Sequence, residues 1–247
     1  KNKKKKYKRV HDDGILVSDE MPEAFDEIFW RVFKDRKYIN KNNISIHNIN
    51  KFELDEYHKY INTITYRENK NFYITKNNIN VLRLNNFRNL KNIFLIITFR
   101  NPFFHSYSLL KTHKIISSKQ KKNPFILSYM NYLVHHEFGL NLKTLNFKKS
   151  FVTKYEDTNI NFWLSYWIYV YENILKNYKY SSNIKFLAYE KFNTDLIKIL
   201  KNFDTNLSIK SKFQFKNKNL SKKIEKIKFE KKLVIKAKKI YSEISKL

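Results

Sequence analysis

The residues best suited to bind an anion lie where an expected buried strand meets an expected helix. Arg100 follows the β-prone run 93–99, and Asn101-Pro102 then opens a helical stretch that carries Ser108. Ligands of parallel α/β sheets bind at the carboxyl ends of strands, where a helix N-terminus offers N–H groups and a positive dipole end. Arg100 adds a bidentate donor for phosphate and Ser108 a hydroxyl. The pattern predicts an anion site, although an ordinary strand-to-helix turn has the same pattern.

The surrounding elements predict one α/β domain over residues 1–247. Buried-type strands that alternate with helices indicate a parallel sheet covered by helices. We expect a loop at 41–50 and a long basic helix at 221–246. The spacing predicts strands over 72–75, 93–99 and 184–189, and helices over 22–32, 53–66, 79–90, 103–114, 125–138, 158–178 and 193–203.

Composition excludes several classes of protein. The 247 residues are enough for a full core, and the absence of cysteine rules out disulfides and thiolate metal sites. No run approaches the roughly 18 apolar residues of a membrane span. The basic segment 1–9 leads into no apolar stretch of the kind found in signal peptides. We therefore expect a cytoplasmic protein without a membrane span.

The formal net charge of +28 leaves two interpretations open. A basic surface binds polyanions by releasing their counterions, so a non-catalytic protein that binds nucleic acid or another polyanion is the alternative function. Only 7 of the 50 basic residues are arginine, and the abundant Lys, Asn, Ile, Phe and Tyr share A/T-rich codons. We interpret most of the lysines as ordinary solvated surface and expect no specific nucleic-acid partner.

Other clusters of polar residues give weaker indications of a functional site. His135-His136-Glu137 lacks the spacing of a helical zinc motif, and neighbours on a helix point about 100° apart, so we expect no metal there. His11, Asp12 and Asp13 are candidates for an acid, a base or ligands, or form a polar loop. His105 is expected to pack within its helix.

The segment 94–110 resembles the 3'-phosphate motif of sulfotransferases that use 3'-phosphoadenosine-5'-phosphosulfate (PAPS). In that family a strand ends in Arg, a D-P or N-P pair often follows, and a Ser lies eight residues after the Arg. The resemblance implies that Arg100 and Ser108 bind the 3'-phosphate of PAPS.

Further segments resemble the same family in the same order. Residues 73–78 are similar to a strand end with a K-T-type pair, which implies that Lys76 lies near the sulfuryl group, although Asn77-Asn78 replaces the Thr and the following His or Pro. Residues 186–200 resemble the family's Y-E-D-L strand and helix, which implies that Tyr189 packs on adenine. The helix around 163–174 and the bacterial-type segment 11–25 extend the resemblance to about 11–205.

One family feature has no counterpart. The [PS]-x-x-G-[ST]-[ST] phosphate loop needs glycine for its tight backbone, but Gly14 and Gly139 do not follow hydrophobic strands. We expect a truncated chain whose fold is a three-layer, P-loop-containing nucleotide hydrolase-like sheet without its first strand and phosphate loop. A relative that has lost catalysis is the less favoured explanation.

The resemblance implies an enzyme that transfers a sulfuryl group from PAPS to a hydroxyl or amine, with no metal cofactor. The acceptor stays open among glycan, lipid, peptide and small molecule. The general base is also open, with His11, Asp12 and Asp13 as candidates.

Overall fold

The computed structural model describes residues 26–88, 90, 93–178, 180–201 and 224–247, together with the backbone of two short strands near the N-terminus. The chain divides into two compact units, which are described separately. Unit 1 comprises Lys1–Lys6, Val17–Phe87 and Ile115–Phe151; unit 2 comprises Tyr7–Leu16, Arg88–Lys114 and Val152–Leu247. One of the boundaries along the chain, between Lys114 and Ile115, falls inside the long helix α4 (Pro102–Lys122). The single domain expected from the sequence stays a prediction.

Unit 1 is mainly helical. Its elements are α1 (Asp26–Phe33), β3 (Asn43–Ser45), α2 (Lys51–Arg67), the 3-10 helix η1 (Asn78–Leu82), α3 (Leu84–Phe87), the second half of α4 (Pro102–Lys122), α5 (Pro124–Tyr132) and β5 (Thr144–Asn146). Strands β3 and β5 pair in parallel. The side chains of Asn50 and Glu53 each accept the other's backbone N–H, a capping box that begins α2.

An aromatic cluster forms the core of unit 1. Trp30 of α1 is fully buried, and Tyr57 of α2 and Phe87 of α3 pack on it with ring centroids 4.7 and 6.2 Å away. Phe29 adds an edge-to-face contact to the same indole at 5.0 Å. Large aromatic side chains bury much apolar area for little lost rotamer freedom, so four rings join three helices.

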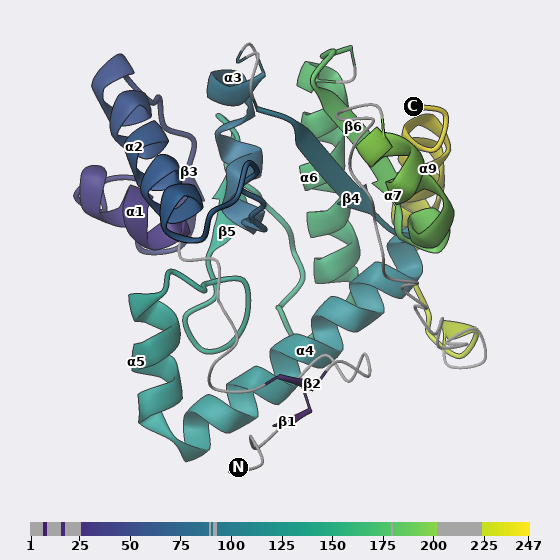
Figure 1. The fold of residues 1–247 in the computed structure, drawn as a ribbon. Coiled ribbons are helices and arrows are strands. Elements are labelled where there is room, and N and C mark those ends of the chain that lie inside the picture. Colours follow the sequence, from purple (N-terminus) through teal and green to yellow (C-terminus); the bar gives the residue numbers. More distant parts are fainter. Residues whose placement is uncertain are drawn as a thin grey trace. The chain divides into compact units, whose positions relative to one another are not determined.

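Unit 2 is built on a parallel pair of strands. Strand β4 (Leu95–Phe99) pairs with β6 (Ile184–Ala188), with Leu95 opposite Ile184 and Phe99 opposite Ala188. Figure 1 shows β4 leading into α4, and β6 leading through η2 (Tyr189–Lys191) into α7 (Phe192–Lys201). The remaining elements are α6 (Ile160–Tyr178), α9 (Lys231–Ile244) and the short strand β1 (Tyr7–Lys8). Strand β1 pairs with β2 (Leu16–Val17), of which Leu16 belongs to this unit and Val17 to unit 1.

Helix α6 supplies most of the buried apolar side chains described in unit 2. Trp163, Trp167, Tyr171 and Ile174 recur at helical spacing and are all buried. The Tyr171 hydroxyl donates a hydrogen bond to the Thr98 carbonyl oxygen at 2.8 Å, which joins α6 to β4.

The structure confirms a mixed α/β chain with parallel strands, and it corrects several elements. Residues 72–75 form no strand, 79–90 splits into η1 and α3, and the helix expected over 125–138 ends at Tyr132. The sequence did not predict β3 and β5. Of the tail expected at 221–246, α9 covers 231–244, while 221–223 lie outside the described residues. In the part of the chain described, no helix combines the length and apolarity needed to cross a bilayer.

Candidate functional site

Arg100 and Tyr189 meet because their strands are paired in register. Phe99 lies opposite Ala188 at the carboxyl ends of β4 and β6, so the next residues of both strands leave the sheet side by side. The Arg100 guanidinium carbon lies 4.6 Å from the Tyr189 ring centroid and 5.9 Å from the Phe104 ring centroid. Cations within about 6 Å of an aromatic face are attracted by the ring quadrupole. The carboxyl ends of β4 and β6 therefore carry the positive charge of Arg100, which lies against the rings of Tyr189 and Phe104.

The N-terminus of α4 differs from the expectation of free N–H groups. The Asn101 side-chain oxygen accepts from the N–H groups of Phe103 and Phe104 at 3.1 and 3.4 Å, and the Asn101 carbonyl accepts from His105 at 2.9 Å. Pro102 has no N–H to offer. These bonds occupy the first-turn donors, so side chains and not the helix backbone must bind an anion here.

Ser108 lies on the face of α4 that carries Phe104. Residues four apart share a helix face and are about one 5.4 Å turn apart, and Arg100 lies over the Phe104 ring. Ser108 is partly buried. Its hydroxyl therefore lies one turn along α4 from the ring that Arg100 covers.

Two polar nitrogens near the carboxyl ends of β4 and β6, a region called the corner below, lack hydrogen-bond partners among the described residues. They are Nε of Arg100 and Nδ1 of His105, and both atoms are buried. Burial, followed by the charge of Arg100, lowers the pKa of His105 to about 4, so this ring is neutral at pH 7. Buried polar atoms without partners cost free energy, and an anionic group bound here would pair with Arg100.

Glu190 places a negative charge at the same carboxyl ends of β4 and β6. Its carboxylate accepts a hydrogen bond from the Asn101 backbone N–H at 3.0 Å, one residue beyond the Arg100–Tyr189 contact. The corner thus carries charges of both signs, and Arg100 lies with the aromatic rings of Phe104 and Tyr189.

Lys76 belongs to unit 1, whereas Arg100, Ser108 and Tyr189 belong to unit 2. The structure brings Arg100 and Tyr189 into contact, and Lys76 is described within its own unit. The Lys76 side chain is exposed, whereas the nearby side chains of Tyr73 and Asn77 are hydrogen-bonded to α1. The Tyr73 hydroxyl donates to Asp26, and the Asn77 amide donates to Glu27 at 2.7 Å while its oxygen caps η1.

Glu27 and Arg83 form a buried pair that sequence reasoning missed. Two guanidinium nitrogens of Arg83 donate to the two Glu27 oxygens at 2.6 and 2.8 Å, and the side chains are 0% and 8% exposed. Tyr38 also donates to Glu27, and Nε of Arg83 donates to His47 at 2.9 Å. The available clue was the position of Arg83 between Leu82 and Leu84 in the apolar stretch 79–90, because buried charges need partners.

The three-residue run His135 to Glu137 also differs from expectation. Because α5 has ended and Val134 is in the left-handed region at φ +59°, the run is not helical. Nδ1 of His135 lies 3.7 Å from a Glu137 oxygen, while His136 is 5% exposed. Within the described residues, no group of three or more histidine and acidic side chains is placed to hold a metal.

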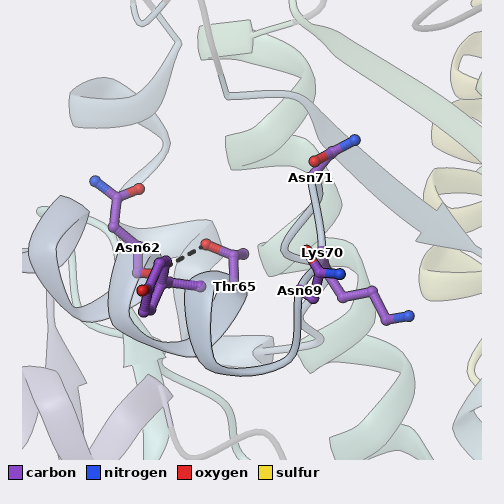
Figure 2. Close-up of a pocket in the computed structure, with 6 residues that line it drawn as sticks. Asn62, Thr65, Asn69, Lys70 and Asn71 are labelled. Carbon is purple, nitrogen blue, oxygen red and sulfur yellow. Dashed lines mark hydrogen bonds between the residues drawn. The ribbon is translucent and has the colours of Figure 1, made fainter.

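An open depression of about 560 Å³ lies at the C-terminal end of α2, and Figure 2 shows residues that line it. Amide side chains and one lysine dominate its lining: Asn62, Thr65, Tyr66, Asn69, Lys70 and Asn71. The Thr65 hydroxyl donates to the backbone carbonyl oxygens of Ile61 and Asn62. The lining residues include no carboxylate and no imidazole.

No family model, no curated protein and no solved structure matches this chain. The candidate site therefore depends on its own geometry and on the resemblance of its segments. His11, Asp12 and Asp13 lie outside the described residues.

Proposed function

We propose that this chain is part of a PAPS-dependent sulfotransferase that transfers a sulfuryl group to a hydroxyl or amine acceptor. The observation that carries the proposal is the contact between Arg100 and Tyr189 at the carboxyl ends of a parallel strand pair. The buried Nε of Arg100 also has no hydrogen-bond partner within the described part of the chain. An arginine held against an aromatic ring suits a ligand that joins a phosphate to a purine.

In this proposal Arg100 pairs with the 3'-phosphate through charge-assisted hydrogen bonds. Ser108 donates its hydroxyl to the same group, and Tyr189 offers an aromatic surface to adenine. Lys76 neutralises charge near the transferred sulfuryl group, as the resemblance implies. The proposed fold is a three-layer, P-loop-like parallel sheet to which β4 and β6 belong.

The reaction needs alignment more than covalent chemistry. The acceptor oxygen or nitrogen forms a bond to sulfur while the bond between sulfur and the 5'-phosphate oxygen breaks, and adenosine 3',5'-bisphosphate leaves with that electron pair. As in phosphoryl transfer, the protein aligns the two groups in line and stabilises charge on the transferred oxygens. The acceptor loses one proton to a base.

The first prediction concerns nucleotide binding. Adenosine 3',5'-bisphosphate should bind more tightly than adenosine 5'-monophosphate, which lacks the 3'-phosphate. Arg100→Ala should weaken binding of the bisphosphate by about 1.5–3 kcal/mol, because a charged hydrogen bond is lost. Isothermal titration calorimetry measures both differences.

Arg67→Ala is the matched control, because the Arg67 side chain is 85% exposed and belongs to α2. Equal affinity for the two nucleotides, or an Arg100→Ala variant that binds as wild type does, would contradict the assignment. Binding to heparin that falls steeply with salt and ignores Arg100→Ala would instead favour the polyanion-binding alternative.

A further inference from the structure

The end of α5 places a histidine and a glutamate side by side. After Tyr132 the chain turns through Val134, and Nδ1 of His135 then lies 3.7 Å from a carboxylate oxygen of Glu137. Their side chains are 45% and 29% exposed, whereas the intervening His136 is buried. The His135 ring is therefore accessible to solvent, and Glu137 is partly buried.

The same glutamate is bonded to the segment that carries Lys76. A Glu137 oxygen accepts from the Asn78 side-chain amide at 2.9 Å, while the other oxygen faces His135. Asn77 is in turn bonded to the buried Glu27. Two residues of chain span at most about 7 Å, so the backbone of Asn78, whose side chain donates to Glu137, lies within about that distance of the Lys76 backbone.

The charge state of the pair suits proton transfer. Burial by itself raises the pKa of Glu137, but hydrogen bonding and charge from His135, and the amide of Asn78, outweigh it and lower the pKa to about 2. Glu137 is thus a carboxylate at neutral pH. A carboxylate beside an imidazole orients the ring and stabilises its protonated form.

Four other histidines in the described chain suit this role less well. One is His113, whose ring lies 3.6 Å from Asp157 but whose pKa is lowered by burial. Burial, as the first cause, lowers the pKa of His47, His105 and His136 to about 4 in each case. A general base works best when its pKa is near the working pH. Lys143 also repels a proton on His136, and Arg83 one on His47.

We propose that His135 is the general base of the reaction and that Glu137 is its positioning residue. This inference rests on the proposed function and on the role of Lys76 within it. The acceptor's proton moves to the His135 ring nitrogen that does not face Glu137. The acceptor oxygen or nitrogen then forms its bond to sulfur, the bond from sulfur to the 5'-phosphate oxygen breaks, and the imidazolium later releases its proton to water.

The pair is tested first, in the chain as it stands. Proton NMR of the histidine rings follows the pKa of His135 in wild type and in Glu137→Gln. Loss of the neighbouring negative charge should lower the pKa of His135 by about 1. A His135 pKa that does not change would overturn the inference.

The base is then tested in the full-length protein, with sulfur-labelled PAPS and three acceptors: 4-nitrophenol, glucosamine and a tyrosine peptide. His135→Gln should lower kcat by about 10²–10⁴-fold and remove the acid limb of the pH profile. Glu137→Gln should shift that limb to lower pH, as in the NMR titration. Affinity for adenosine 3',5'-bisphosphate should stay unchanged in both variants, and His58→Gln is the matched control.

The outcomes separate the two proposals. Transfer by wild type that His135→Gln retains would overturn the base assignment and leave the sulfotransferase proposal standing. If wild type transfers a sulfuryl group to none of the three acceptors, the base assignment is overturned. If wild type also fails to bind adenosine 3',5'-bisphosphate, the sulfotransferase proposal is overturned with it. If His135→Gln fails to fold, Glu137→Gln and its pH profile decide the question.

Discussion

Arg83 carries its charge into the interior of unit 1, where Glu27 is its counter-ion and His47, Tyr38 and Asn80 complete its surroundings. The guanidinium also lies 5.0 Å from the Trp30 ring centroid. Burial alone raises the pKa of Glu27, but Arg83, Tyr38 and Asn77 outweigh it and hold the pKa below its ordinary value. The same carboxylate that neutralises Arg83 also holds Asn77, next to Lys76.

Removing one partner of this pair should be costly. Arg83→Met should lower the free energy of unfolding by about 3–5 kcal/mol, because the Glu27 charge would then be buried without compensation. The double variant Glu27→Gln/Arg83→Met should recover part of that loss, because it leaves no unpaired charge. Urea unfolding measures all three proteins. Arg67→Met is the control, since its contact with Glu68 is long and exposed.

Single residues also show what a sequence can predict. The Arg100–Ser108 spacing and Tyr189 were visible in the sequence because each follows a strand with a strong local pattern. The Glu27–Arg83 pair was not visible, because its partners lie 56 positions apart and depend on tertiary packing. Asn77 and Asn78 were noted only as departures from a family pattern, yet in the structure they bond to Glu27 and Glu137.

At the scale of elements, α4 depends on its cap. Asn101→Ala should lower the free energy of unfolding by about 1 kcal/mol, because the N–H groups of Phe103 and Phe104 lose their acceptor. Asn101→Asp keeps an acceptor at that place and should unfold as wild type does. Thermal and urea unfolding compare the three proteins, and an alanine variant of full stability would contradict the capping role.

The segment between α5 and β5 depends on a glycine. Gly139 has φ +91°, and a Cβ there would lie 2.2–2.7 Å from the Gln120 carboxamide. Gly139→Ala should lower the free energy of unfolding by at least about 1–2 kcal/mol, the cost of the left-handed backbone alone. It should also displace Gln120, whose oxygen accepts from the Leu140 N–H at 2.7 Å.

A double-mutant cycle separates the two causes. In a Gln120→Ala background the clash is absent, so Gly139→Ala should cost only its backbone part. Equal costs of Gly139→Ala in both backgrounds would show that Gln120 moves aside freely.

Elements were predictable where the local pattern was long. The apolar runs that became β4 and β6, and the helices α2 and α6, have enough residues for their periodicity to be clear. The three-residue strands β3 and β5 are too short for such a pattern. The expected strand at 72–75 is absent, and Tyr73 instead sends its hydroxyl to Asp26 of α1.

At the scale of the whole molecule, acid should weaken folding before the carboxylates titrate. Burial lowers the pKa of His47, His105 and His136 to about 4, against about 6.5 in an unfolded chain. Between those values the unfolded chain binds more protons. The free energy of unfolding should therefore fall as pH decreases from about 6.5 to 4, by at most about 1.4 kcal/mol per pH unit for each histidine.

Glu27 and Glu137 extend this loss to lower pH, because their lowered pKa values stabilise the fold only while they stay ionised. Urea unfolding at several pH values between 7.5 and 4.5 measures the histidine part. His136→Gln, which cannot titrate, should give a flatter curve than wild type. Stability independent of pH in this range would contradict the neutral, buried state of these rings.

The matched register of β4 and β6 sets how this chain can vary in length. Asn101 and Glu190 are hydrogen-bonded across 89 positions of sequence, and their closeness depends on five paired residues in each strand. Loops between the strands can gain or lose residues with little effect on that closeness. One residue inserted within either strand would turn Arg100 or Tyr189 to the opposite face of the sheet. Homologues should therefore vary in loop length and keep both strands free of insertions.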